Sequence, residues 1–509
     1  MAAVPRILHV IAQLSPGGAS RAAITVARYS TRRGAYQHSL LSLLPAAPLG
    51  AALAREAGLA LLDAPLAAEV HSAIAGADVV HLHFWNTPEL YALLRAPWPA
   101  ARLILWLHVG GASMPQVVTA EVAAFGDRVV AGSAYNSELP VLRAPHAAPA
   151  SLITEPADLE ALAGLQPLPH AGFNVGYIGT VDFEKMNADF IALSAAVRVP
   201  ARFIVCGPGG GYEQLRRQVQ RLGVAERFDF RGYLRDLRAV LAELDVLGYP
   251  LCPDNYSSAE LVLREAMFAG VPPVVLPYGG AARVVTDGVT GVVAADAAGY
   301  GAAIERLFHN PLERARLGRN GHDEVASHFT PEAAAAQFDA LYAAVLQRPK
   351  RERAWTGAAH SGAEQFIEAL GEGAGDFITS RSAAEPGAAV DACLAAEARI
   401  GAASPLLASA TSGGVLHYRR YFPSDAYLRL WAGLVLHGQG RHALAVAEFA
   451  QAARLGLDHW RVAWYQAQAA EACGATERAR AAADAVLQAA PLFEPAQALR
   501  QRLESTDAR

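Results

Sequence analysis

The sequence predicts an α/β protein with two Rossmann-like domains, followed by an all-α domain. Three observations lead to this fold class. Short apolar runs with the length of buried strands alternate with Ala-rich helical segments over roughly the first 350 residues, as in parallel βα units. The alternation restarts once, near residue 173, which gives two halves of about 150 to 180 residues each. Beyond residue 349 the strand-like runs stop and a helical repeat begins.

The first half opens with "RILHVIAQL" (6–14), which has the length of a buried strand. It leads through "SPGGASR" into a helical pattern that stops at Gly34. Four more apolar runs have the length of strands: "YQHSLLSLL", "DVVHLHFW", "ARLILWLHV" and "DRVVAGS". We therefore assign residues 1–160 to an N-terminal Rossmann-like domain.

The second half begins at "FNVGYIGTVDF" (173–183) and continues through "ARFIVCGPGGG", "ERFDFRGY", "LDVLGYP", "VPPVVLP" and "TGVVAAD". The join lies near residues 156–172, which are rich in Pro and Gly. A helix over 330–348 starts with Thr330 as N-cap and Pro331 at the first helical position. Residues 161–348 are predicted to form a second Rossmann-like domain.

The composition changes after residue 349, so residues 349–425 are interpreted as a linker and irregular helical region. Residues 426–509 contain an internal repeat, in which Gly440 and Gly474 stand 34 residues apart. Ala445 and Ala479 follow them at the same offset. This spacing resembles tetratricopeptide repeats; an ordinary Ala-rich helical hairpin is the alternative.

Composition and charge exclude several classes of protein. The 509 residues are 53% apolar and 18% charged, with a net charge of −5 and a pI near 6.4, which argues against a general nucleic-acid binder. The four cysteines lie far apart, in neither a zinc pattern nor a disulfide framework, so a reducing compartment is expected. The N-terminal apolar run is too short for a signal peptide, and no uninterrupted apolar 18-mer occurs. We expect a cytoplasmic protein without a transmembrane segment.

Four motifs give the first two domains a family resemblance. They are "SPGGASR", "GYIGTVDFEKMN", "VCGPGGG" and, most specifically, "SSAELVLREAMFAGVPPVVLPYGGAARVVTDGVTGVV". In this order, residues 5–348 resemble the family 4 retaining glycosyltransferases of the GT-B fold. The resemblance implies two domains that face a cleft, a nucleotide-sugar donor in that cleft, and transfer of the sugar to an acceptor hydroxyl with retention. No enzyme nucleophile is evident, which suits attack by the acceptor on the same face within an ion pair.

The donor site is expected around a helix that starts near Ser257 and Ser258, whose N–H groups would face the diphosphate. By resemblance, Glu265 binds the nucleotide ribose. The family's sugar-binding glutamate is replaced by Ser257, so either Glu260 takes over that contact or the sugar is held differently. Outside the family context, two glutamates on a helix are usually solvated. The predicted donor-binding residues are Gly17, Gly18, Gly179, Thr180, Lys185, Ser257, Ser258, Ala259, Glu260, Leu261 and Glu265.

The predicted catalytic residues are Lys185, Glu260 and His108. Lys185 matches the family's basic residue, whereas Thr180 replaces the usual arginine; a surface pair with Glu184 is the alternative for Lys185. The chain has no Asp-x-Asp pair, so Lys185 and helix N–H groups are expected to stabilise the leaving diphosphate without a metal. No cofactor is expected, and the nucleotide sugar is a co-substrate.

Histidines end two of the predicted strands. By resemblance, His108 lies where acceptor and sugar meet, although a lone histidine is more often structural. Because His81, His83 and His108 have no acidic ligand at metal spacing, zinc is not expected.

The helical repeats carry an aromatic set that suits a groove for a peptide acceptor. This set comprises Tyr427, Trp431, Arg461, Trp464, Tyr465 and Gln468. Two repeats are too few to stack alone, so packing on residues 363–420, on the catalytic domains or on a second subunit is the alternative. The expected partners are a nucleotide-sugar donor and a glycan, protein or peptide acceptor, with a homodimer through the tail as a further option.

A non-catalytic glycosyltransferase-like scaffold that binds protein through its repeats is the alternative function. Ser257 and Thr180 favour the scaffold, whereas Lys185 together with Glu265 favours the enzyme.

Overall fold

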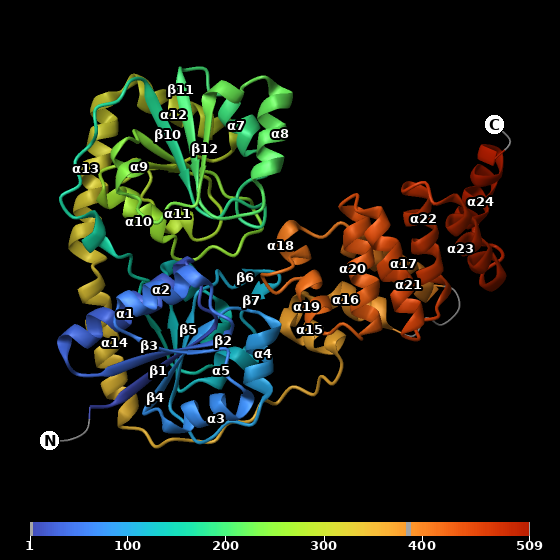
Figure 1. The fold of residues 1–509 in the computed structure, drawn as a ribbon, viewed down its shortest axis with the longest axis horizontal. Helices are drawn as coiled ribbons and strands as arrows, with labels where there is room; N and C mark the ends of the chain where they lie inside the picture. Colours follow the sequence, from blue (N-terminus) through green and yellow to red (C-terminus); the bar gives the residue numbers. More distant parts are fainter. Residues whose placement is uncertain (1–3, 383–387, 508–509) are drawn as a thin grey trace. The chain divides into compact units, whose positions relative to one another are not determined.

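The computed structural model describes residues 4–382 and 388–507, which fold as two compact units. Unit 1 consists of Met1–Trp85 and Ala92–Trp355, and unit 2 of Asn86–Tyr91 and Thr356–Arg509. Unit 1 contains two parallel sheets covered by helices, and unit 2 is helical (Figure 1). The predicted order, two α/β domains and then an all-helical region, is confirmed.

The N-terminal sheet has seven parallel strands within the described residues. In spatial order they are β3 (Ala60–Asp63), β2 (Gln37–Leu44), β1 (Arg6–Gln13), β4 (Val79–Phe84), β5 (Leu103–Leu107), β8 (Arg128–Ala131) and β9 (Ala150–Leu152). A short hairpin pairs β6 (Ala112–Ser113) with β7 (Gln116–Val117). The helices of this part are α1 (Gly18–Arg33), α2 (Pro48–Glu56), α3 (Ala67–Gly76), α4 (Pro88–Arg95), α5 (Ala120–Phe125) and α6 (Ala134–Ser137). Every residue of β4 and β5 is buried, as expected for central strands of a parallel sheet.

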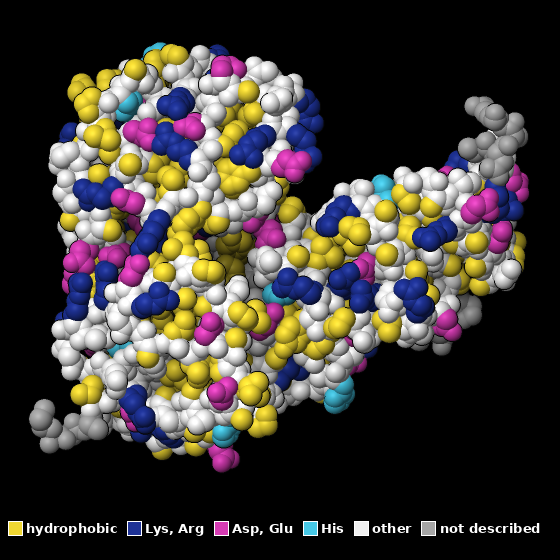
Figure 2. All heavy atoms as spheres, viewed as in Figure 1, with side chains coloured by type: hydrophobic (Ala, Val, Ile, Leu, Met, Phe, Trp, Pro, Cys, Tyr) yellow, Lys and Arg dark blue, Asp and Glu magenta, His cyan; other side chains and the backbone are white. Residues whose placement is uncertain are grey.

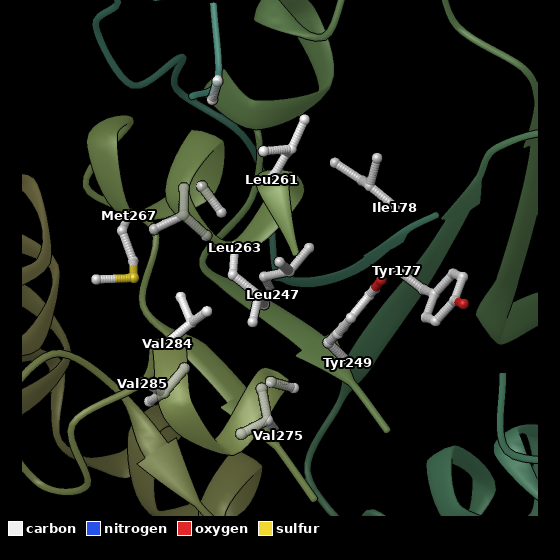
Figure 3. Close-up of a cluster of buried hydrophobic side chains, with 14 of the residues drawn as sticks. Tyr177, Ile178, Leu247, Tyr249, Leu261, Leu263, Met267, Val275, Val284 and Val285 are labelled. Atoms are coloured by element: carbon white, nitrogen blue, oxygen red, sulfur yellow. The ribbon is translucent and has the colours of Figure 1, made fainter. Parts of the chain in front are cut away.

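The C-terminal sheet has six parallel strands among the described residues. Their order is β12 (Phe228–Gly232), β11 (Ala201–Cys206), β10 (Phe173–Ile178), β13 (Val246–Tyr249), β14 (Pro273–Val275) and β15 (Val292–Val293). The helices are α7 (Phe190–Ala195), α8 (Tyr212–Leu222), α9 (Arg238–Ala242), α10 (Leu261–Phe268), α11 (Ala281–Val284), α12 (Ala297–His309) and α13 (Pro311–His328). Leu263 and Met267 of α10 belong to the same buried apolar cluster as Leu247 and Val275 of the sheet (Figure 3).

The last helix of the predicted second domain packs on the first sheet. Helix α14 (Pro331–Leu346) begins as predicted, because the Thr330 side chain accepts a hydrogen bond from Ala333 N–H. Its Phe338 ring then lies 4.6 Å from the Trp106 ring of β5, centroid to centroid. The chain therefore crosses back to the N-terminal sheet, so the end of the segment 161–348 packs with the first domain.

Unit 2 is built from helices α15 (Gly362–Leu370), α16 (Gly375–Arg381), α17 (Ala388–Gly401), α18 (Pro405–Ala408), α19 (Val415–Tyr421), α20 (Ala426–Gly438), α21 (His442–Arg454), α22 (Trp460–Ala472), α23 (Thr476–Ala489) and α24 (Glu494–Asp507). Residues 356–425 are thus largely helical and belong to this unit, instead of forming a linker. The pairs α20/α21 and α22/α23 repeat, and each pair turns through a glycine with positive φ, Gly440 (74°) and Gly474 (72°).

The surface in view carries intermingled acidic and basic side chains over unit 1 (Figure 2). None of the described helices combines the length and apolarity that crossing a membrane requires.

Candidate functional site at the domain junction

The two domains of unit 1 meet at the carboxyl ends of their strands, where ligands of open α/β sheets bind. Close approaches at three points mark this junction. Gly110 N–H donates to the Tyr256 carbonyl oxygen (2.9 Å), and the hydroxyls of Ser133 and Ser258 lie 2.9 Å apart. The third joins Gly18, at the start of α1, to the Leu261 side chain, which a Cβ on Gly18 would meet at 3.7 Å.

Helix α10 begins at Leu261, three residues later than the predicted start near Ser257 and Ser258. Glu260, just before it, adopts φ 46° and ψ 66°, a left-handed conformation that is uncommon outside glycine. Such backbone strain persists only where surrounding contacts fix it. The first N–H groups of a helix lack partners within it, which makes the start of α10 a candidate anion site.

The side chain of Glu260 supplies those contacts. Its Oε2 atom lies 3.0 Å from Lys185 Nζ and accepts a hydrogen bond from the Tyr249 hydroxyl. Burial, followed by the charge of Glu260, raises the pKa of Tyr249 well above its usual value, so the phenol stays a donor. Lys185 Nζ also lies 5.5 Å from the centre of the Tyr256 ring. Lys185 therefore pairs with Glu260, and its side chain is only 14% exposed, unlike the surface residue of the alternative interpretation.

Glu265 lies in the second turn of α10 and is 2% exposed. One of its oxygens, Oε1, forms an ion pair with Arg21 of α1, from the other domain. The charge of Glu265 raises the pKa of Arg21. The second oxygen, Oε2, is buried and has no hydrogen-bond partner among the described residues. An unsatisfied buried acceptor is costly, so this oxygen is placed for a group that the chain itself does not provide.

The loop before α10 is held rigidly. Ser257 N–H donates to Asn255 Oδ1 (2.9 Å), and Ser257 Oγ accepts from Gly280 N–H (3.1 Å). A Cβ on Gly280 would lie 1.7 Å from the Ser258 carbonyl oxygen, so only glycine fits there. Ala259 contributes its carbonyl oxygen, which accepts from the Arg264 guanidinium.

The glycines of "GPGGG" pack against the loop that contains Gly179 and Thr180. A Cβ on Gly207, whose φ is 139°, would lie 1.7 Å from the Gly179 carbonyl oxygen. The Thr180 carbonyl accepts from the Tyr177 hydroxyl (2.9 Å). These glycines therefore allow the two loops to approach closely. In the N-terminal domain, Gly17 and Gly18 are themselves exposed.

His108 belongs to a second cluster, apart from Lys185 and Glu260. It follows β5 and is buried, with Nε2 2.8 Å from His83 Nδ1 and Nδ1 3.0 Å from Glu155 Oε1. His81 and His83 stack in the same cluster, and His9, which the sequence reasoning did not single out, joins them. One ring nitrogen from each of His9, His81 and His83 lies within 4.8 Å of the others.

Several residues of the junction were missed from sequence. Tyr249 and Glu155 are the main examples, because they become neighbours of predicted residues only through the fold. The histidine cluster did carry a signal. His9, His81 and His83 stand at alternate positions of short apolar strands, a period that places such residues on one face of a sheet.

In unit 2 the predicted peptide groove is wrong for four of its six residues. Trp431, Arg461, Trp464 and Tyr465 are buried, and Tyr427 and Gln468 are half-buried. Trp464 packs edge-on against the Phe493 ring at 5.2 Å.

The reason is that α16 and α17 occupy the side on which a peptide would lie. The Trp431 indole donates to Ser380 Oγ (3.0 Å). Arg461 pairs with Glu397 (3.0 Å), which also accepts from the Tyr465 hydroxyl (2.8 Å). These side chains form the interior of unit 2, as the packing alternative anticipated for residues 363–420.

Comparison with known proteins connects this geometry to one class of enzyme. Residues 172–310 match the family described as "Glycosyl transferases group 1". A lipopolysaccharide core biosynthesis glycosyltransferase of Rhizobium meliloti is 28% identical over 144 residues, which cover 28% of this chain and 42% of the relative. A 2-deoxystreptamine glucosyltransferase of Streptomyces kanamyceticus is 28% identical over 203 residues, which cover 38% of this chain and 52% of the relative. The chain thus spans about half the length of these curated relatives.

The crystal structure of the Anabaena protein HepE with UDP-glucose superposes on 67% of this chain and 99% of its own, with a TM-score of 0.57 at 19% identity. This likeness concerns the fold. Residues 172–310 are therefore similar to a group 1 glycosyltransferase domain, and the two α/β domains have a GT-B-type fold.

Proposed function

We propose that the protein is a retaining glycosyltransferase that moves a sugar from a nucleotide-activated donor to an acceptor hydroxyl. The observation that carries this proposal is Glu265 Oε2, a buried carboxylate oxygen without a partner in the described chain, at the carboxyl edge of the C-terminal sheet. A ribose hydroxyl of the donor would satisfy it. The family domain at residues 172–310 supports the same conclusion.

The leaving diphosphate gains negative charge as the glycosidic bond breaks, so the site must present positive charge to it. Lys185 has three N–H donors, of which one faces Glu260. The others, with the first N–H groups of α10, bind the diphosphate. In this arrangement Glu260 positions Lys185, because its carboxylate is occupied by Lys185 and Tyr249 instead of being open to a sugar hydroxyl.

The proposed chemistry has no enzyme nucleophile. The acceptor hydroxyl attacks the oxocarbenium-like sugar on the face that the diphosphate leaves, which retains the configuration. Positive charge comes from Lys185 and from the α10 N–H groups, so no metal is required in this scheme. Contacts such as Ser133 to Ser258 hold the domains together around the reacting groups and limit hydrolysis by water.

The test is a donor panel analysed by mass spectrometry of the products. Purified protein incubated with UDP-, GDP- and ADP-sugars and a cell extract should give a new glycoside and the free nucleoside diphosphate from one donor class. The anomeric configuration of that product, determined by NMR, should equal that of the donor. An inverted product would contradict the retaining mechanism, and no product from any donor would contradict the activity.

A specific observation favours the non-catalytic alternative. Lys185 and Glu265 are both paired with side chains of the chain itself, and Ser257 replaces a residue expected to hold the sugar. A scaffold that has lost donor binding would keep such internal pairs permanently. Thermal unfolding separates the two functions, because only the enzyme should be stabilised by its nucleoside diphosphate.

A further inference from the structure

The helix-covered face of the N-terminal sheet contains a row of buried histidines that the proposed reaction does not use. His38 on β2, His9 on β1 and His83 on β4 lie on one face of adjacent strands, and His108 follows β5 on that face. Helix α14 packs over this face. Polar side chains in a core usually cost stability, so a full row of them requires an explanation.

Hydrogen bonds join these residues into a chain from Asp339 to His108, and the Glu155 carboxylate lies close to the His108 end; we call this set the histidine row. Its successive contacts are Asp339 Oδ1 to Ser30 Oγ (2.5 Å), Ser30 Oγ to His38 Nε2 (2.8 Å), His38 Nδ1 to His9 Nε2 (2.9 Å), His9 Nδ1 to His83 Nε2 (2.9 Å), His83 Nδ1 to His108 Nε2 (2.8 Å) and His108 Nδ1 to Glu155 Oε1 (3.0 Å). His38, His9 and His83 each use both ring nitrogens in hydrogen bonds.

The Asp339 end fixes the direction of every hydrogen bond. Asp339 accepts from Arg33 Nε (2.7 Å), and an ionised carboxylate can only accept, so Ser30 must donate its single proton to it. Ser30 Oγ must then accept from His38 Nε2–H. If His38 is neutral, its Nδ1 is bare and must accept from His9 Nε2–H. The same step repeats along the row to His108.

The inner imidazoles are neutral, as this argument requires. Burial lowers the pKa of His38 to about 4 and those of His9 and His83 well below their usual value, and the neighbouring histidines lower the latter two further. Each of these rings therefore has one proton, on Nε2.

At the His108 end, these hydrogen-bond directions leave no proton between His108 and Glu155. His108 donates from Nε2 to His83, so a neutral His108 would turn a bare Nδ1 toward Glu155 Oε1, with two acceptors facing each other at 3.0 Å. Neither atom has a hydrogen-bond partner among the described residues. One additional proton between His108 and Glu155 removes the conflict.

We propose that the histidine row is a proton relay that holds one transferable proton, shared by His108 and Glu155 at the junction end and deliverable to Asp339 at the other end. In the transfer, each imidazole accepts a proton on Nδ1 and gives one from Nε2 to the next ring. Ser30 accepts from His38 and donates to Asp339. The net result is that one proton leaves the His108–Glu155 pair, Asp339 becomes neutral, and no inner residue changes its charge.

Both end states satisfy all the hydrogen bonds of the row. After transfer, every ring has its proton on Nδ1, and His108 Nδ1–H donates to an ionised Glu155. Neighbouring polar groups set the relative free energies of the two states. Arg33 and the Tyr36 hydroxyl lie at the Asp339 end, and Arg264 lies near Glu155. His81 stacks on His83 and hydrogen-bonds the Tyr342 hydroxyl (2.8 Å), but it is a side branch and not a member of the row.

A metal ion is the competing use of these imidazoles, because His9, His81 and His83 each offer a nitrogen within 4.8 Å of the others. The hydrogen bonds favour the relay: two of the nitrogens, His9 Nδ1 and His83 Nε2, already bond to each other at 2.9 Å. Among the described residues, no carboxylate belongs to this group of three histidines.

The relay matters for the site because of where it ends. Glu155 and His108 follow β9 and β5, at the carboxyl edge that carries Gly110 and the junction. If the proposed glycosyl transfer holds, the row sets the charge beside the departing diphosphate and exchanges that proton with the outside while the junction is closed. The effect on the diphosphate rests on the proposed function. The positions of the protons along the row do not.

The test is NMR of histidine labelled with ¹⁵N, which reads the protonation of each ring nitrogen without any activity. In the wild-type protein near neutral pH, His38, His9 and His83 should be protonated on Nε2 alone. The additional proton should appear on His108 Nδ1 or, if that nitrogen is bare, as a protonated Glu155 side chain in ¹³C spectra. A bare His108 Nδ1 beside an ionised Glu155 would overturn the proposal.

Two isosteric variants sharpen the test. In Asp339→Asn the amide can donate to Ser30, so the whole row should reverse and His38, His9, His83 and His108 should switch from Nε2–H to Nδ1–H. In Glu155→Gln the new amide donates to His108 Nδ1, so His108 should lose its second proton while the inner rings keep theirs. His81 should change in neither variant and is the internal control.

Two further results would overturn the relay. Unchanged tautomers at His9 and His83 in Asp339→Asn would overturn the relay, because they would show that the bonds are not coupled. A stoichiometric transition metal in the purified wild-type protein, measured by elemental analysis, would also overturn it, since the metal would occupy the nitrogens that the relay needs. If Asp339→Asn fails to fold, the wild-type and Glu155→Gln spectra still decide the question.

Discussion

The two sheets of unit 1 are both covered by helices, but they differ in what they bury. Under α10, the C-terminal sheet buries Leu247 and Val275 against Leu263 and Met267 (Figure 3). Under α14, the N-terminal sheet buries a row of histidines joined by hydrogen bonds. Both halves are stabilised by apolar contact, and the N-terminal half adds directional bonds that depend on protonation.

The difference between the two halves should have its largest effect on the free energy of unfolding at acidic pH. Burial lowers the pKa of His9, His38, His81 and His83 below the ordinary value of 6.5, to about 4 for His38. Below pH 6.5 the unfolded chain therefore binds protons that the folded chain does not, so stability is complete above pH 6.5 and falls as the pH drops toward 4. At about 1.4 kcal/mol per pH unit for each of four groups, the loss between pH 7.5 and 5.5 is about 5 kcal/mol.

Urea unfolding at the two pH values, followed by fluorescence, measures this loss. A change below about 1 kcal/mol would mean that the row is not buried in its neutral form.

The apolar half should respond to lost volume instead of pH. Leu263→Ala removes buried methyl groups from the contact between α10 and the sheet and should cost about 3 kcal/mol. Because no titratable group is lost, the cost should be equal at pH 7.5 and 5.5. A cost that changed with pH would show that the two halves do not differ as described.

Substitutions at the junction between the two domains should affect stability and activity in different ways. Lys185→Ala should lower kcat/KM about 100-fold, because it removes a charge from the diphosphate site. It should also destabilise the protein, since Glu260 is left buried with an unpaired charge.

Adding Glu260→Gln to Lys185→Ala is the control. The double variant should recover most of the stability and none of the activity. Recovery of activity would show that Lys185 serves only to pair with Glu260.

The smallest effect is expected at His81, the side branch of the row. His81→Leu leaves the Tyr342 hydroxyl without its partner, at a cost of about 1 kcal/mol at pH 7.5. It also removes one of the four neutral histidines, so the acid loss should shrink from about 5 to about 4 kcal/mol. An unchanged acid loss would assign the pH dependence to other groups.

The sequence predicted the α/β class and the helical tail, because strand-length apolar runs, turn glycines and motif order are local signals. It placed the start of α10 three residues too early, since the left-handed backbone of Glu260 depends on contacts with Lys185 and Tyr249 that are distant in sequence. The histidine row needed the strand order, which brings β2, β1, β4 and β5 together and which periodicity alone does not provide. The aromatic set of the tail was placed in a groove because α16 and α17 have weak periodicity, so the partners that bury it were not recognised.

The central claim is that a nucleotide donor binds at the junction and satisfies Glu265. Titration calorimetry with UDP, GDP and ADP, on the wild-type protein and on Glu265→Gln, tests it most directly. One diphosphate should bind the wild-type protein stoichiometrically, and Glu265→Gln should weaken that binding by about 10- to 100-fold, because hydrogen bonds to a charged group contribute about 1.5 to 3 kcal/mol. No binding by any of the three nucleotides, or equal affinity in the variant, would contradict the account.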